Sequence, residues 1–392
     1  MIRKYLPALI IFCLLGLPLP ALAASDDETA AAFSLQDAVS NLDLAVLEEY
    51  KSNIDSEITY YMDGKTVKDL LLEFVQGKWE FDIKELGSNL MQFLFKEISA
   101  NSGLLGKLLI LSVLAALLLN LQSAFASGIA QISYLACFMA LAAIAIGSFR
   151  VVLELGQHTV DNMVTFMMAM LPQMLVLTAG LGNIHASAIL FPILMTVATA
   201  FANAVKNIVF PLIIMSAILS LINHMSGSLK VEKMSKFCGQ MAQVSLGLFL
   251  SVFVGFVTLR ALYASVLDKV ALRTTKFVTD NAIPVVGKMV SDSIEVAAGY
   301  VVMLKQALGV VGVIIILGII IFPLLKVAAL ALIYKITAAV VEPLGDAKTA
   351  AILDTMSSHL FLMLAAVASV GLMFFIMIAI VAGMSNGLGA LR

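Results

Sequence analysis

The stretch VVMLKQALGVVGVIIILGIIIFPLL, residues 301–325, contains one charged side chain, Lys305, and is otherwise almost wholly apolar. A run of about 18 or more largely uncharged residues is typical of a transmembrane helix. The whole sequence is 61% hydrophobic and 13% charged, with a mean hydropathy of +1.02, whereas soluble domains are about half apolar and a quarter charged. The apolar runs do not alternate with polar residues, as the strands of a membrane β-barrel do. We therefore predict an all-α polytopic membrane protein.

The apolar runs predict about eight or nine membrane segments. They are residues 104–125, 129–149, 164–181, 186–205, 208–225, 241–263, 301–321, 322–341 and 360–381. The most basic short loop contains Lys230, Lys233 and Lys236, and the positive-inside bias predicts that this loop is cytoplasmic. A chain that starts outside reaches the loop on the inside after the first five of these segments, so the charge pattern and the start of the chain agree.

The first 100 residues predict an exported segment. Residues 1–24 have a basic start, a short apolar core and Ala-Leu-Ala at 21–23, the pattern of a signal peptide. An uncleaved first span is the alternative, but the core is short and ends at Pro18 and Pro20, which favours cleavage. Residues 25–100 carry sixteen Asp or Glu against six Lys, and their apolar residues recur at helical spacing. We expect a small helical, extracytoplasmic domain there, followed by a two-span hairpin at 101–149.

The membrane region contains a probable internal duplication at an offset of 112 residues. Pro172 coincides with Pro284, and the triplet Phe-Pro-Leu at 210–212 coincides with the same triplet at 322–324. The two predicted repeats are residues 150–263 and 264–392. Paired repeats with helices broken at matching positions are a known transporter architecture, in which the breaks line a central site. Pro172, Pro211, Pro284 and Pro323 are therefore candidate structural or pore residues.

The stretch DNAIPVVGKMVSDS, residues 280–293, is the most polar segment between the apolar runs. Pro284 removes a helical hydrogen bond and Gly287 permits close approach of the backbone. Irregular backbone at membrane depth persists only where protein or water covers it. The segment is therefore either a re-entrant hairpin that faces a cavity, which we favour, or an interfacial loop. Lys288, Asp292 and Glu295 either close the hairpin as a local charge cluster or line the cavity.

Two lysines in the segment 322–341 are further candidates, because ionisable residues inside spans are functional by default. Lys326 and Lys335 are nine residues apart, which places them on opposite faces of a helix. Each either extends its ammonium group to the membrane interface or contacts a pore or another subunit.

The sequence contains no arrangement of residues that indicates catalysis or a cofactor. The four histidines, His158, His185, His224 and His359, are scattered near span ends, and we interpret them as interfacial polar residues. No phosphate-binding GxxxxGK[ST] loop is present, so any ATPase has to be a separate subunit. The three cysteines are not at metal-ligand spacing. No basic cluster with interleaved aromatic residues indicates nucleic-acid binding.

Several stretches together resemble the stage III sporulation protein AE family of endospore-forming bacteria. They are LLEFVQGKWEFDIKE (71–85), FLFKEISANSGLLGKLLIL (93–111), LQSAF (121–125), KFVTDNAIPVVGKM (276–289) and FPLLKVAALALIYKITAAVVEPLGD (322–346). The order and spacing of these modest motifs carry the resemblance, which covers nearly the whole chain.

The resemblance implies a non-enzymatic membrane subunit of a channel or secretion-like complex in the mother-cell membrane around the forespore. It implies other stage III sporulation membrane proteins as partners, a separate ATPase among them, besides membrane lipid and further copies of the chain. The duplication and the polar segment at 280–293 support an alternative, a secondary transporter-like permease that binds a small solute between two repeats.

Overall fold

The computed structural model describes residues 83–125, 128–180, 184–225, 230–282, 286–344 and 346–383. The predicted signal peptide, most of the predicted domain at 25–100, and Pro284 lie outside these residues. The described part of the chain is entirely helical, as the sequence predicts. Its helices are α6 (Ile83–Ala100), α7 (Ser102–Phe125), α8 (Gly128–Gly180), α9 (Ile184–Ala204), the π-helix η2 (Val205–Val209), α10 (Phe210–Met225), α11 (Glu232–Ala282), α12 (Val286–Val341), the 3₁₀-helix η3 (Glu342–Leu344) and α13 (Ala347–Gly383).

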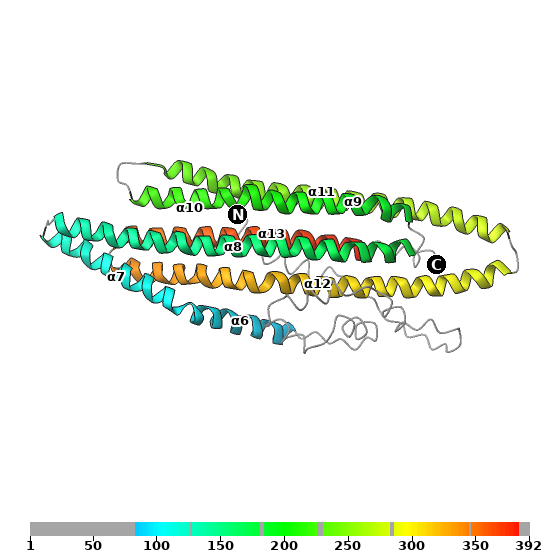
Figure 1. Cartoon of the computed structure of the whole chain (residues 1–392), viewed down its shortest axis with the longest axis horizontal. Helices are drawn as coiled ribbons and strands as arrows, with labels where there is room; N and C mark the ends of the chain where they lie inside the picture. The colour runs from blue at the N-terminus through cyan, green and yellow to red at the C-terminus, as the bar shows by residue number, and fades with distance from the viewer. Residues whose placement is uncertain are drawn as a thin grey trace. The chain divides into compact units, whose positions relative to one another are not determined.

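Helices α8 to α13 run alongside one another (Figure 1), and α12 and α13 have the most extensive contact. Helix α6 packs on α12 through its predicted apolar stripe. Phe93, on that stripe, is buried and meets the ring of Phe322 edge-on, with 4.8 Å between ring centroids. The prediction of an apolar helix face before the first span is confirmed at this residue.

Six helical regions among the described residues are long and apolar enough to cross a membrane. The count of eight or nine is not reached, because three pairs of predicted spans form continuous helices. The predicted spans 129–149 and 164–181 form α8, and the spans 301–321 and 322–341 form part of α12. The spans 186–205 and 208–225 form the continuous run of α9, η2 and α10. The charged residues between the spans remain helical, and Arg150 and Glu154 even form an i,i+4 ion pair within α8. Of the predicted basic loop after α10, Lys233 and Lys236 lie in the first turns of α11. Three crossings and five crossings are both odd numbers, so the predicted side of this basic segment does not depend on the span count and stays a prediction.

The helix boundaries of the two predicted repeats do not follow the offset of 112 residues. The connection at 181–183, between α8 and α9, corresponds to residues 293–295, which lie within α12. The connection at 283–285 corresponds to residues 171–173, which lie within α8. The paired breaks are therefore not found at these positions, and the duplication remains a sequence prediction.

The two Phe-Pro-Leu triplets also differ in local structure. Pro211 cannot donate a hydrogen bond, and its ring would clash with the carbonyl four residues earlier. The helix widens by one residue just before it, as η2, where the N–H of Phe210 donates to the carbonyl of Val205. Pro323 instead lies inside the uninterrupted helix α12.

Small residues let α8, α12 and α13 approach closely. A methyl group added to Gly309 would lie 2.6 Å from Cβ of Ala382, and one added to Gly312 would lie 1.9 Å from Cε of Met170. Methionines 163, 167, 170 and 174 of α8 are fully buried in the same core, where their flexible side chains fill irregular space.

Candidate functional site

The predicted site residues whose side chains the structure describes are spread over α8, α10 and α12. Pro172 and Pro323 are half-buried inside α8 and α12, whereas Pro211 is exposed at the start of α10. Gly287, Lys288, Asp292 and Glu295 belong to the first turns of α12, and their side chains lie outside the described part. The backbone is helical there, so Lys288 and Asp292 stand at i,i+4 and share a face.

Lys335 forms an ion pair with Asp354 that joins α12 to α13. Both side chains are about half exposed, at 49% and 48%. Lys326, on the other face of α12, is partly buried. The two lysines are thus on separate faces, as predicted, and Lys335 has a specific partner that the sequence reading did not identify.

Polar side chains do converge at another place, between α10, α11 and α13. Ser216 of α10 and Ser235 of α11 are 2% and 5% exposed. The hydroxyl of Ser216 donates to the carbonyl of Ser235 over 2.7 Å, and the hydroxyl of Ser235 donates to the carbonyl of Ser216 over 2.8 Å. These reciprocal bonds fasten α10 to α11. Gly239, one turn after Ser235, makes room, because a methyl group there would lie 3.0 Å from Oγ of Ser216.

His359 of α13 joins this pair of serines. Its Nε2 lies 2.8 Å from Oγ of Ser216, and its Nδ1 lies 2.7 Å from the carbonyl oxygen of Thr355, one turn earlier in α13. The ring is partly buried and meets Phe149 of α8, with 6.4 Å between ring centroids. We call Ser216, Ser235 and His359 the serine–histidine cluster. It connects three helices through side chains 19 and 143 residues apart in the sequence.

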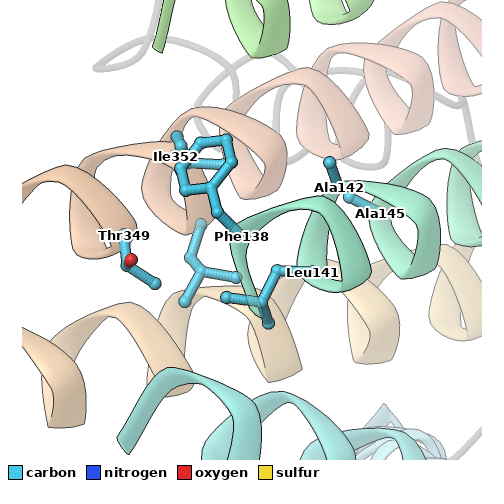
Figure 2. Close-up of a pocket in the computed structure, with 7 residues that line it drawn as sticks. Phe138, Leu141, Ala142, Ala145, Thr349 and Ile352 are labelled. Carbon is cyan, nitrogen blue, oxygen red and sulfur yellow. The ribbon is translucent and has the colours of Figure 1, made fainter. Parts of the chain in front are cut away.

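Ser216 and His359 are at the distance of a nucleophilic serine and its base. A nucleophilic serine also needs access to its substrate, and Ser216 is buried between the helices in this structure. A cavity of about 10 Å³ lies between α8 and α13, and none of the three cluster residues lines it (Figure 2). Its lining is apolar apart from Thr349, and its volume is at the lower limit for one water molecule.

Other hydrogen bonds connect the C-terminal part of α12 and the N-terminal part of α13 to each other and to α8. Tyr334, fully buried in α12, donates to Oγ of Ser148 in α8 over 2.8 Å. Ser357 of α13 donates to the carbonyl of Ala331 in α12 over 2.8 Å. Tyr134 of α8 donates over 3.3 Å to Asp346, which precedes α13. These bonds fix the helices that carry and surround His359.

Among the described residues, no group of three or more His, Cys, Asp or Glu side chains is placed to hold a metal ion. Cys137 and Cys238 are both free thiols.

Comparison with known proteins gives one consistent result. Residues 65–385 match the sequence profile of the family described as stage III sporulation protein AE. The stage III sporulation protein AE of Bacillus subtilis (strain 168) is 34% identical over 320 residues, which are 81% of this chain and 80% of the relative. No solved structure matches the chain.

Proposed function

Because the chain belongs to the stage III sporulation protein AE family, and is a multi-pass membrane protein, we propose that it is a non-enzymatic subunit of a sporulation channel complex. In this proposal the complex is secretion-like, joins the mother cell to the forespore, and is needed for late forespore development. The observation that carries the proposal is the extent of the family match. It covers residues 65–385 and therefore the whole described helical bundle.

The surface of the bundle supports a role in assembly within the membrane. Large apolar side chains are exposed on α7 and α11, among them Ile110 at 69%, Leu117 at 55% and Val244 at 64%. Exposed apolar surface of this kind contacts lipid or other membrane proteins. The partners we propose are lipid, other stage III sporulation membrane proteins, a separate ATPase subunit, and further copies of this chain.

We place the protein in the mother-cell membrane that surrounds the forespore. In this orientation the domain at 25–100 is extracytoplasmic, after removal of a signal peptide at 1–24, and the loop with Lys230, Lys233 and Lys236 is cytoplasmic. The excess of acidic residues at 25–100 and the basic loop after α10 support it.

The permease alternative loses its main argument, because the helix breaks of the two predicted repeats do not coincide. Its remaining support is the polar segment 280–293, whose proline lies outside the described residues. The test below therefore includes a result that would indicate a solute-binding role.

The test is affinity purification of the tagged chain from sporulating cells, followed by identification of the membrane proteins that co-purify. We expect other stage III sporulation proteins with the full chain. We expect their loss with a chain that lacks residues 25–100 behind an intact signal sequence, and membrane insertion of that chain serves as the control. Purification of the full chain alone, together with solute uptake by liposomes that contain only this chain, would overturn the proposal in favour of a permease.

A further inference from the structure

The serine–histidine cluster has more hydrogen-bond acceptors than a neutral histidine can satisfy. A backbone carbonyl only accepts hydrogen bonds, whereas a serine hydroxyl has one proton to donate. Ser216 gives its proton to the carbonyl of Ser235, and Ser235 gives its proton to the carbonyl of Ser216. When both of these bonds are made at once, both hydroxyl protons are used, and Oγ of Ser216 can then only accept a hydrogen bond from His359.

The histidine ring is held from both sides by acceptors. Nδ1 lies 2.7 Å from the carbonyl oxygen of Thr355, and Nε2 lies 2.8 Å from Oγ of Ser216. Both nitrogens must carry a proton for all four bonds to form, and only the imidazolium ring has two N–H donors. A neutral ring with its proton on Nε2 would turn the lone pair of Nδ1 toward the Thr355 carbonyl, so that hydrogen bond would be lost. A neutral ring with its proton on Nδ1 can bond Ser216 only if the Ser216 hydroxyl donates to Nε2 instead of to the carbonyl of Ser235.

We propose that His359 is a proton-binding site whose occupancy controls the contact between α10 and α11. With the proton bound, both serine–carbonyl bonds between α10 and α11 are made. When the proton leaves Nε2, the hydroxyl of Ser216 turns to donate to Nε2, and its bond to the carbonyl of Ser235 is lost. The proton goes to water, and no other bond changes. One of two bonds that fasten α10 to α11 therefore depends on a ring carried by α13.

The charged groups on the surrounding helices are directed into ion pairs of their own. They are Arg150 with Glu154 on α8, Lys236 with Glu232 on α11, and Lys335 of α12 with Asp354 of α13. The Nδ1 atom of His224 on α10 donates to the carbonyl of Ser220, and Lys233 is exposed on α11. In the region the structure describes, none of these groups is hydrogen-bonded to the His359 ring, whose direct partners are Ser216 and the carbonyl of Thr355.

The cluster is placed where such a change has consequences. Ser235 lies in the first turn of α11, which begins at Glu232 and also carries Lys233. Loss of one of the two bonds to α10 therefore weakens the attachment of this first turn to α10. The proposed ligand is a proton, and the property that it changes is the strength of the contact between α10 and α11.

The first measurement counts protons on the ring. The full-length protein, with ¹⁵N-labelled histidine, is reconstituted in lipid nanodiscs, and the His359 signals are assigned by comparison with His359→Gln. We expect two N–H groups on the His359 ring at the acid end of a titration, and loss of the Nε2 proton at higher pH. A ring with one N–H throughout the range in which the protein is folded would overturn the proposal.

The second measurement follows the helix contact by hydrogen–deuterium exchange, expressed as protection factors for peptides from α10 and the start of α11. Loss of one hydrogen bond is expected to lower protection by about three- to tenfold as the ring loses its proton. His359→Gln keeps a donor toward Ser216 at every pH and should abolish this dependence.

The matched control is His224→Gln, because the Nδ1 atom of His224 makes the same kind of contact, 2.7 Å from the carbonyl of Ser220, away from the serine pair. It should leave the pH dependence unchanged. An equal pH dependence in His359→Gln and in the wild-type protein would overturn the proposal. If His359→Gln does not fold, the His359 signals are assigned by elimination with His158→Gln, His185→Gln and His224→Gln, and the proton count on the wild-type ring decides the question.

Discussion

Lys206 binds both carboxylate oxygens of Asp161, with its Nζ 2.7 Å from Oδ1 and 2.6 Å from Oδ2. The pair joins η2 to the middle of α8, inside the 47-residue apolar region Ile132–Thr178. A helix rises about 1.5 Å per residue, and the hydrocarbon core of a bilayer is about 30 Å thick. One bilayer therefore covers less than half of that region. The exposed charges of α8, Arg150, Glu154 and Asp161, indicate where the hydrocarbon core ends along the helix.

The first prediction concerns the energy of this ion pair. A double-mutant cycle with Asp161→Ala and Lys206→Ala, measured by unfolding in nanodiscs, should give a coupling below about 1 kcal/mol, as for pairs exposed to water. Lys206 and Asp161 are 26% and 53% exposed. A lone charge at the bilayer centre would cost about 2.5–3.5 kcal/mol, so a coupling well above 1 kcal/mol would place the pair in lipid instead. A cycle on Arg150 and Glu154 in the same helix is the control.

The second prediction concerns water access along α8. In a chain whose native cysteines have been replaced, Glu154→Cys should react with a membrane-impermeant maleimide, because Glu154 lies among the exposed charges of the helix. Val176→Cys, 69% exposed on the apolar stretch beyond, should be protected by lipid. Labelling of both positions in detergent is the control for reactivity. Protection of Glu154→Cys in intact membranes, with reactivity in detergent, would contradict a water boundary at this level.

The third prediction concerns helix packing at the glycines. Gly309→Ala should destabilise the protein by about 1–3 kcal/mol, the usual range for overpacking, because its new methyl group meets Cβ of Ala382 at 2.6 Å and a backbone must move. Gly312→Ala should cost less, since the atom it meets belongs to the flexible end of Met170. Thermal unfolding in one detergent gives the ranking.

Gly247→Ala in α11 is the matched control for those variants, because nothing lies within 4 Å of the added methyl group. Alanine is favoured over glycine inside a helix by roughly 0.5–1 kcal/mol, so this change should raise stability. A loss of stability at Gly247 equal to that at Gly309 would mean that packing against Ala382 is not the cause.

The helical class, the apolar helix face that contains Phe93 and the end of α12 at Val341 were predictable, because each depends on local spacing or on local hydropathy. The number of membrane spans was not predictable in the same way. Hydropathy locates apolar segments, but whether the helix continues between them depends on contacts such as that of Lys206 with Asp161, 45 residues away. The same limit applies to His359: the sequence indicates an interfacial histidine, whereas its partner Ser216 is 143 residues distant. Distant pairs of single polar residues leave no local pattern.

The fourth prediction concerns the start of α13. Asp346 is fully buried and is the N-cap of the helix: its Oδ1 accepts the backbone N–H of Thr349 over 3.0 Å and the hydroxyl of Tyr134 over 3.3 Å. Asp346→Ala removes the cap and leaves buried donors unsatisfied, so we expect a loss of about 1–3 kcal/mol in the free energy of unfolding. Asp346→Asn retains a cap oxygen and should cost less. Because α13 carries His359, Asp346→Ala should also lower the protection of α10 against hydrogen exchange, whereas Thr355→Val, at an exposed hydroxyl of the same helix, should not. Equal stability of Asp346→Ala and the wild-type protein would show that the cap does not hold α13 in place.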